Sequence, residues 1–239
     1  MGRLTFILGG ARSGKSTFAE HLASQRSDRV AYIATAQALD DEMAARIAVH
    51  RRKRPASWQT LEIPAGIGKA MRSNPPNVDV IIIDCLTLLV SNLLLRMADK
   101  SNAHPELRSG AEHSSGIEHS SGSEHSSGSE SHTGDEHFSL GEHTSDTERL
   151  INVEYFTAND RMAAAAIDQE LNELQGAIRE NSADWILVSN EVGMGLVPPY
   201  PQGRIYRDLL GWANQRMASK ADQVYFMIAG IPMRLTPEQ

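Results

Sequence analysis

The fold of this 239-residue chain is decided by the stretch Gly9-Gly10-Ala11-Arg12-Ser13-Gly14-Lys15-Ser16. This stretch matches the phosphate-binding pattern G-x-x-x-x-G-K-[ST] at every fixed position. Residues 4–8 before it are apolar and β-prone, and residues 17–23 after it carry apolar side chains at helical spacing. The pattern therefore lies between a predicted buried strand and a predicted helix, which is the context that a nucleotide-binding loop of this kind requires.

The residue types in this loop suit the binding of a polyphosphate. Glycines at positions 9 and 14 let the backbone bend and approach the phosphates without a Cβ in the way. Successive backbone N–H groups then face the phosphate oxygens at a helix N-terminus, where the helix dipole favours anions. We expect all of 9–16 to contact the nucleotide, with Lys15 at the β- and γ-phosphates and the Ser16 hydroxyl on Mg²⁺. A glycine-rich turn that binds no ligand is the alternative interpretation.

Composition excludes several classes of protein. Residues 101–150 contain ten acidic and two basic residues out of totals of 30 and 23, so the rest of the chain is nearly neutral despite the net charge of -7. A nearly neutral domain is not a strongly basic nucleic-acid binder. The chain shows no N-terminal signal segment and no apolar run that could span a bilayer, and its single cysteine, Cys85, excludes an internal disulfide. We therefore expect a cytoplasmic protein without a nucleic-acid partner or a membrane span.

Predicted strands alternate with predicted helices along the chain. This alternation favours a P-loop NTPase-like α/β fold, with a mostly parallel sheet and helices on both faces. We expect a single domain over residues 1–239. The predicted strands are 4–8, 30–35, 58–63, 78–84, 185–189 and 224–228, and the helices after the first one are 40–50, 64–70, 86–97, 161–179 and 207–217.

Residues 101–147 interrupt this domain with a different composition. Serine, glycine, glutamate and histidine dominate, and the unit Glu-His-Ser-Ser-Gly recurs from positions 112, 118 and 124. Because so few apolar residues do not offset the entropy lost on folding, we expect a long disordered insertion. Seven of the nine histidines lie in it, so adventitious binding of Zn²⁺ or Ni²⁺ is one interpretation, and a solvated linker without a specific ligand is the favoured one.

A further feature of nucleotide-binding folds is the apolar run at 78–83, which ends in Asp84. A carboxylate at the end of such a strand lies near the phosphate loop in the Walker-B arrangement, where it holds Mg²⁺ directly or through water. An ordinary buried strand followed by a helix N-cap aspartate is the alternative. The phosphate loop upstream makes the magnesium role the favoured one.

Several blocks follow the phosphate loop in a set order: Tyr-Ile-Ala-Thr-Ala-Gln at 32–37, Asp-Asp-Glu-Met-Ala-Ala-Arg-Ile at 40–47, His50, Asp-Cys-Leu-Thr at 84–87, Ser-Asn-Glu-Val-Gly-Met-Gly at 189–195, Tyr-Arg-Asp at 206–208, Gly211 and Asn214-Gln215. Together they resemble the bifunctional adenosylcobinamide kinase/adenosylcobinamide-phosphate guanylyltransferase family of cobalamin biosynthesis. The resemblance covers residues 4–100 and about 155–235. The family has a short connection where this chain carries its insertion.

The resemblance implies a two-step enzyme that uses Mg²⁺. In the first step, ATP or GTP phosphorylates the aminopropanol hydroxyl of adenosylcobinamide. In the second step, GTP gives GMP to an active-site histidine, and adenosylcobinamide phosphate takes the GMP to form adenosylcobinamide-GDP. By its position after Ala-Arg-Ile the histidine is His50 here, and Lys15 is the other catalytic residue. A neutral imidazole is a competent nucleophile near neutral pH, which explains the residue type. The family also implies a homo-oligomer, a trimer with nucleotide near the subunit boundaries.

The resemblance also implies nucleotide-binding residues outside the loop. The basic run Arg51-Arg52-Lys53-Arg54 could counter the charge on phosphate oxygens during transfer, and a solvated face is its alternative interpretation. For His50, the alternative is a histidine at a helix end that interacts with the helix dipole. Glu191 resembles an active-site carboxylate without an assigned role, and its alternative is a loop acid that accepts backbone N–H groups. His21 has no comparable context and is expected on the surface. The resemblance implies that Thr35, Ala36, Gln37 and Glu62 lie in segments around the guanine nucleotide. Together with the basic run and the strand-end carboxylate, the expected nucleotide-binding residues outside the loop are Thr35, Ala36, Gln37, Arg51, Arg52, Lys53, Arg54, Glu62 and Asp84.

Two other functions remain open at this point. A kinase-only or guanylyltransferase-only descendant would keep the fold and lose one reaction. A regulatory nucleotide-binding switch would bind and slowly hydrolyse nucleotide without transferring a group. Spacing identifies no base for the kinase step and does not separate ATP from GTP as its donor.

Overall fold

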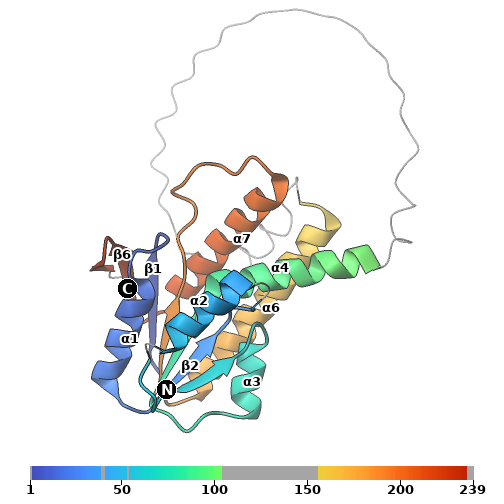
Figure 1. The fold of residues 1–239 in the computed structure, drawn as a ribbon. Helices are drawn as coiled ribbons and strands as arrows, with labels where there is room; N and C mark the ends of the chain where they lie inside the picture. Colours follow the sequence, from blue (N-terminus) through green and yellow to red (C-terminus); the bar gives the residue numbers. More distant parts are fainter. Residues whose placement is uncertain (1, 39–40, 53, 104–155, 236–239) are drawn as a thin grey trace, which may run out of the picture.

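The computed structural model of the chain describes residues 2–38, 41–52, 54–103 and 156–235. Within them, strands and helices alternate and build one sheet with helices on both faces (Figure 1). The predicted α/β class is therefore confirmed. The strands are β1 (Leu4–Gly9), β2 (Val30–Ala34), β3 (Gln59–Glu62), β4 (Val80–Asp84), β5 (Asp184–Val188), β6 (Gln223–Ile228) and β7 (Ile231–Leu235).

The strands lie side by side in the order β3-β2-β4-β5-β1-β6-β7, and only the β6–β7 pair is antiparallel. Strands far apart in sequence are therefore hydrogen-bonded neighbours, as where Leu4 of β1 pairs with Trp185 of β5. The β4 residues from Val80 to Ile83 are at most 1% exposed, because helices cover both faces of this central strand. Burial on both faces explains why the strand is a continuous apolar run.

Two sets of helices cover the two faces of the sheet (Figure 1). One face, which presents Ile7, Ile82 and Ile186, packs against α1 (Lys15–Arg26). The opposite face, which presents Phe6 and Ile83, packs against the remaining large helices. α2 (Asp41–Arg52) follows β2 along the chain and contributes to the cavity described below. The helices on this opposite face are α3 (Ile67–Ser73), α4 (Leu86–Ala103), α6 (Ala158–Glu180) and α7 (Pro201–Ala218).

Two helices, α6 and α7, begin earlier than apolar periodicity predicts, because their first turns are polar. The first turn of α6 is stabilised by a reciprocal cap, in which the Thr157 side chain accepts the Asp160 N–H and the Asp160 carboxylate accepts the Thr157 N–H. α7 begins at Pro201, and proline suits the first turn of a helix because its missing N–H has no intrahelical partner there.

β7 is a strand that the sequence pattern does not predict. The chain turns at Ala229 and Gly230, both with positive φ, and returns antiparallel to β6. Its apolar residues alternate at Ile231, Met233 and Leu235, but all five residues of the strand are exposed, so the strand is defined by its pairing with β6 and not by burial. The predicted insertion at 101–147 lies outside the described residues from 104 onward, and α4 continues to Ala103. Across the described ranges, no helix is both long and apolar enough to cross a membrane.

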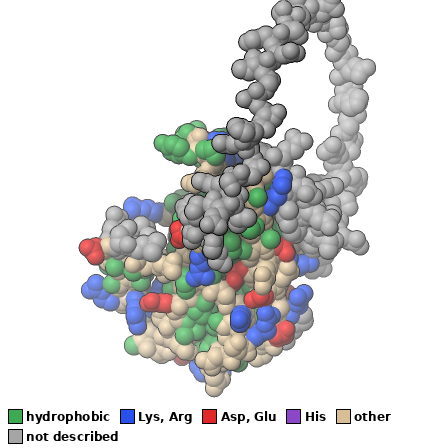
Figure 2. Space-filling view, turned by 90° about the vertical axis from the view of Figure 1, so that its right-hand side faces the viewer, with side chains coloured by type: hydrophobic (Ala, Val, Ile, Leu, Met, Phe, Trp, Pro, Cys, Tyr) green, Lys and Arg blue, Asp and Glu red, His purple; other side chains and the backbone are tan. Residues whose placement is uncertain are grey.

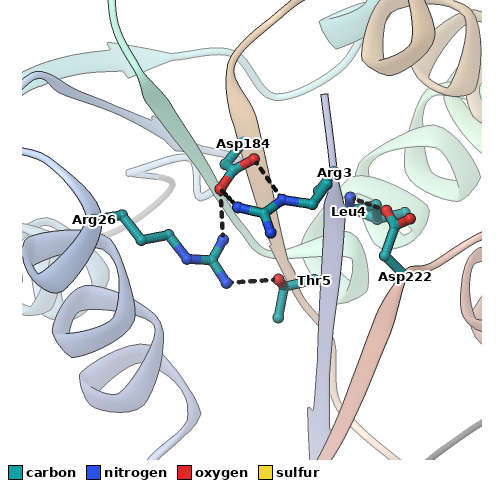
Figure 3. A network of polar contacts seen from close by, with 6 residues as sticks. All are labelled: Arg3, Leu4, Thr5, Arg26, Asp184 and Asp222. Carbon is teal, nitrogen blue, oxygen red and sulfur yellow. Dashed lines mark hydrogen bonds and ion pairs between the residues drawn. The ribbon is translucent and has the colours of Figure 1, made fainter. Parts of the chain in front are cut away.

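Charged side chains join the amino ends of the strands (Figure 3). Arg3 donates to both carboxylate oxygens of Asp184, at 3.3 Å and 3.0 Å. Arg26, at the end of α1, donates to the same carboxylate at 3.5 Å and to the Thr5 hydroxyl at 3.1 Å. These contacts join β1, β5 and α1 at the end of the sheet opposite to the phosphate loop.

Candidate functional site

The predicted phosphate loop connects the end of β1 to the start of α1, so the predicted strand–loop–helix context is confirmed. Its backbone takes positive φ at Gly9 (154°), Arg12 (58°) and Gly14 (94°). A Cβ on Gly9 would lie 2.6 Å from the carbonyl oxygen of Met227. Glycine is therefore required at position 9 by the close approach of β6, and at position 14 by the left-handed backbone.

Donors for an anion gather where this loop enters α1. The first backbone N–H groups of a helix have no intrahelical acceptor, and the helix dipole favours negative charge there. Lys15 is only 7% exposed and donates from its ammonium to the Gly10 carbonyl oxygen at 2.6 Å. Burial lowers the pKa of Lys15. The Ser13 hydroxyl oxygen is buried and has no hydrogen-bond partner within the described residues. Because buried polar groups are normally hydrogen-bonded, this hydroxyl is suited to bind an oxyanion such as a phosphate.

A cavity of about 350 Å³ lies beside this loop. It is built where the carboxyl ends of neighbouring strands meet, which is where open α/β sheets place their ligands. α1, α2, the first turn of α4, the strands β2, β3 and β4, and the loop after β5 contribute to its walls. The lining residues are Ser16, Tyr32, Ala34, Ala36, Ile47, Arg51, Arg54, Thr60, Glu62, Asp84, Cys85, Thr87, Leu88 and Asn190.

Asp84, the last residue of β4, lines this cavity and is held by Tyr32. The Tyr32 hydroxyl donates to Asp84 Oδ2 at 2.5 Å. Burial, reinforced by the Asp84 charge, raises the pKa of Tyr32, so the hydroxyl keeps its proton and remains a donor. The guanidinium carbon of Arg54 lies 3.3 Å from the centroid of the Tyr32 ring, and Arg54 Nε lies 3.6 Å from Glu20 Oε1. Arg54 is therefore engaged by groups of the protein.

Thr35 is part of the framework behind the cavity. Its hydroxyl donates to the Cys85 carbonyl oxygen at 2.8 Å and accepts the Cys85 N–H at 2.7 Å. Asn92 donates from its side chain to the backbone carbonyls of Thr35 and Pro64. Burial raises the pKa of Cys85 to about 11, so its thiol is neutral near neutral pH and is not an activated nucleophile.

A hydrogen-bond network fixes the chain where β5 ends. Ser189 donates to Asn214 Oδ1 at 2.7 Å, and Asn214 donates to the Asn190 carbonyl oxygen at 3.0 Å. The Asn190 N–H donates to Thr87 Oγ1 at 2.7 Å. The network links the first turn of α4 and the loop after β5 to α7. It therefore holds Thr87 and Asn190 in the cavity wall.

Glu191 stabilises the loop that follows. Its carboxylate accepts the N–H groups of Gly193 at 2.5 Å and Met194 at 3.0 Å. Its own N–H donates to the Gly9 carbonyl oxygen at 3.1 Å. The contacts are those of a loop acid that accepts backbone N–H groups, and they tie this loop to the phosphate loop.

The predicted residues outside the phosphate loop fall into different places. Thr35 is buried in the framework, while Gln37 and Arg52 are exposed, and these three do not line the cavity. His21 is exposed on α1, as expected. Lys53 and the side chain of His50 lie outside the described part of the chain. The predicted residues that do line the cavity are Ser16, Ala36, Arg51, Arg54, Glu62 and Asp84.

Other cavity residues escape sequence reasoning. Thr87 could have been predicted from the sequence, because Thr87 closely follows β4 and ligands bind beyond the carboxyl ends of parallel strands. Tyr32 carries no such signal, since it lies inside a strand whose residues are all buried. The lining residues that were missed are Tyr32, Ala34, Ile47, Thr60, Cys85, Thr87, Leu88 and Asn190.

Comparison with known proteins gives the family. Residues 5–122 and 142–235 match the family described as cobinamide kinase / cobinamide phosphate guanyltransferase, CobU. The chain belongs to the CobU family. It is 36% identical to the bifunctional adenosylcobalamin biosynthesis protein CobP of Pseudomonas aeruginosa, over 97% of this chain and 96% of that protein. It is 34% and 30% identical to the proteins of the same description named CobU in Salmonella typhimurium and Escherichia coli, over 97% of this chain and 99% of each relative. The resemblance drawn from the sequence is thereby confirmed.

The oxygen atoms at the site fit a magnesium ion. The Ser16 hydroxyl and the Asp84 carboxylate line the same cavity, and Mg²⁺ prefers such hard oxygen ligands. No group of three or more His, Cys, Asp and Glu residues forms a metal cage in the part of the chain that the structure describes. An ion here would therefore take its other ligands from water and from the phosphates of the nucleotide that a CobU-family kinase and guanyltransferase uses.

Proposed function

We propose that this chain catalyses both reactions of its family. It phosphorylates the aminopropanol hydroxyl of adenosylcobinamide with ATP or GTP, and it then converts the phosphate to adenosylcobinamide-GDP with GTP, releasing pyrophosphate. The observation that carries the proposal is the phosphate loop of a CobU-family chain, with its buried Lys15 and unpartnered Ser13 hydroxyl, opening beside a cavity that also contains Asp84.

The phosphate loop would hold the transferred phosphates through its backbone N–H groups and Lys15. Lys15 is already buried beside the loop, so moving its ammonium from the Gly10 carbonyl to a phosphate requires only a local change of partner. Ser16 and Asp84 would hold Mg²⁺, which neutralises charge on the phosphate oxygens when it is bound. Positioning and charge neutralisation meet the main needs of phosphoryl transfer, whose loose transition state does not require a strong base.

The cavity beside the loop would receive the nucleoside. Glu62 supplies a carboxylate in its wall, which can accept hydrogen bonds from the adjacent N–H donors on the edge of guanine. Arg51 is exposed in the same wall and carries a permanent positive charge that suits a phosphate. Ala36 adds a small apolar surface at the end of β2.

His50 would be the nucleophile of the guanylyl transfer. Ile47 and Arg51 of α2 line the cavity, and position 50 is three residues after the first and one before the second, on the same turn of helix. A neutral imidazole would attack the α-phosphorus of GTP, forming an N–P bond as the bond to pyrophosphate breaks. The substrate phosphate would then attack the same phosphorus and release the imidazole.

The oligomeric state belongs to the same proposal. We expect a homo-oligomer, a trimer as in the family, in the cytoplasm. Its support is a group of exposed apolar side chains on the loop before α7, where Leu196 is 96%, Met194 81% and Tyr200 75% exposed. Figure 2 shows hydrophobic side chains gathered on a projection near the top of the molecule, at the height of this loop in Figure 1. Contiguous exposed apolar surface of this kind favours association.

Labelling with α-³²P GTP and Mg²⁺ tests the transferase reaction. We expect protein-bound label that survives denaturation, resists base and is lost in acid, which is the behaviour of a phosphoramidate. His50→Ala should abolish the label without abolishing GTP binding. His21→Ala is the matched control, because His21 is an exposed histidine on α1 that bonds to Gln25, and it should label normally.

The same experiment separates the remaining functions. Absence of label despite GTP binding would contradict the guanylyltransferase part of the proposal. A cobinamide phosphorylation assay would then distinguish the two remaining functions. A kinase-only enzyme forms cobinamide phosphate without His50, whereas a nucleotide-binding switch forms none.

A further inference from the structure

The sheet register brings Tyr32 and Asp84 to one face of neighbouring strands. Tyr32 pairs with Ile82, and Ala34 pairs with Asp84, so Asp84 lies two residues beyond the position opposite Tyr32. Residues two apart on a strand share a face, and a long aromatic side chain reaches such a diagonal neighbour. This face of the sheet is covered by α1, the helix that directly follows the phosphate loop.

The hydrogen bond from Tyr32 engages one oxygen of the Asp84 carboxylate. The hydroxyl lies 2.5 Å from Oδ2, while Oδ1 accepts no hydrogen bond from any residue that the structure describes. A carboxylate without this bond rotates about its Cβ–Cγ bond and presents either oxygen. With the bond made, Oδ1 is left for a cation or its bound water, in an orientation set before the ion arrives.

Arg54 in turn holds the Tyr32 ring. Its guanidinium carbon is 3.3 Å from the ring centroid, its side chain is only 8% exposed, and its Nε lies 3.6 Å from Glu20 of α1. Arg51, by contrast, is exposed in the cavity wall, and its guanidinium has no hydrogen bond or ion pair with any residue that the structure describes. The two arginines are therefore in different situations, although they belong to the same basic run.

We propose that Tyr32 is a positioning residue that orients Asp84 for Mg²⁺, and that Arg54 holds Tyr32 in place while Arg51 serves the nucleotide phosphates. The inference rests on the proposed function in taking Asp84 as a magnesium-binding carboxylate. The inference assigns different roles to Arg51 and Arg54, two residues of the basic run that the sequence alone does not distinguish.

Binding of Mn²⁺ to the protein–GDP complex, followed by the electron paramagnetic resonance of free Mn²⁺, tests the role of Tyr32. Tyr32→Phe keeps the ring beneath Arg54 and removes only the hydroxyl. We expect it to weaken Mn²⁺ binding about tenfold, the lower end of the effect of partners that orient metal ligands. Tyr225→Phe is the matched control, because Tyr225 is a half-buried tyrosine that packs on Phe18 away from the cavity. It should leave Mn²⁺ binding unchanged.

Two further measurements separate positioning from general structure. In EDTA, the affinity of Tyr32→Phe for GDP should stay within about twofold of the parent, because the phosphate loop itself is untouched. Equal losses of GDP and Mn²⁺ affinity, or unchanged Mn²⁺ affinity, would overturn the proposal. Asp84→Asn should weaken Mn²⁺ binding more than Tyr32→Phe does. If Asp84→Asn left Mn²⁺ binding intact, the metal site of the proposed function would fail together with this inference, whereas a loss in Asp84→Asn alone would overturn only the role of Tyr32.

The arginine pair provides an independent comparison. Arg51→Gln should weaken GDP binding in EDTA, whereas Arg54→Gln should weaken Mn²⁺ binding and leave metal-free GDP affinity within about twofold. The Arg54→Gln loss should not add to that of Tyr32→Phe, because both act through one carboxylate. The opposite pattern, with Arg54→Gln weakening GDP binding in EDTA, would overturn the division of roles. Arg54→Gln keeps the hydroxyl, so it carries the Mn²⁺ test even if Tyr32→Phe loses its fold.

Discussion

The two ends of the central sheet both carry charged side chains, and they use them differently. At the amino end, Arg3 and Arg26 share Asp184, and Arg29 pairs with Asp79. Each of these cations has a carboxylate partner, and the contacts of Arg3 and Arg26 join two strands and a helix (Figure 3). Donors and acceptors that satisfy one another in this way stabilise the fold and leave little to offer a ligand.

At the carboxyl end, several charged and polar side chains can still form hydrogen bonds or ion pairs with a ligand. Lys15 donates to a loop carbonyl, and within the described ranges neither the Ser13 hydroxyl nor the Arg51 guanidinium has a partner. Arg51 lines the cavity, and Lys15 and Ser13 belong to the loop that leads to Ser16 in the cavity wall. The difference shows that charge alone does not mark a site, whereas unused hydrogen-bonding capacity around a cavity does.

The largest effect that this comparison predicts is on nucleotide binding. Lys15→Ala should weaken GTP binding by about 100-fold or more, because it removes a buried cation from the phosphates. Isothermal calorimetry measures the loss, and Lys69→Ala, at an exposed lysine on α3, is the control. Undiminished affinity in Lys15→Ala would mean that the carboxyl end is not the nucleotide site.

A change at the amino end should affect stability alone. Asp184→Asn should lower the free energy of unfolding by about 1 kcal/mol, because both Arg3 and Arg26 lose a charged partner that is partly exposed. Urea unfolding measures this, and GTP affinity should remain within about twofold of the parent. A loss of GTP affinity comparable to that of Lys15→Ala would break the comparison between the two ends.

Acid should remove a smaller contribution at the same end. Hydrogen bonds from Arg29 and then Ser27 lower the pKa of Asp79 to about 2, from an ordinary value of 3.8. Because the folded-state pKa is depressed, the contribution is complete above pH 3.8 and is lost as pH falls towards about 2. Urea midpoints of the parent and Asp79→Asn should therefore differ at neutral pH and converge over that window. A difference that did not depend on pH would contradict the ionic origin of the effect.

The smallest effect is expected for a deletion within the predicted insertion. α4 is described through Ala103, so the deletion is placed at residues 104–145, within the predicted disordered insertion. The thermal midpoint should change by less than about 2 °C, because a segment poor in apolar residues buries little surface. Turnover should be nearly unchanged. A large loss of either would show that the insertion packs against one end of the sheet or takes part in catalysis.

Sequence reasoning reached the parts of the fold that are encoded locally. The loop at 9–16, the buried strand ending in Asp84 and the alternation of strands with helices all follow from neighbouring residues, and the structure confirms each. It missed β7, because this exposed strand is defined by its pairing with β6. The role of Thr35 at the nucleotide stays a prediction, and the structure adds that the Thr35 hydroxyl is engaged by the backbone of Cys85.

The sequence by itself determined the phosphate loop and the family, because eight consecutive residues set the loop's backbone and ordered blocks identify the family. The tertiary structure alone decided which side chains share the cavity. Tyr32, Arg54 and Asp84 are brought together by the pairing of β2 with β4 and by the turn after α2. Strand order and register depend on long-range packing of the whole sheet, so no local pattern in the chain contains them.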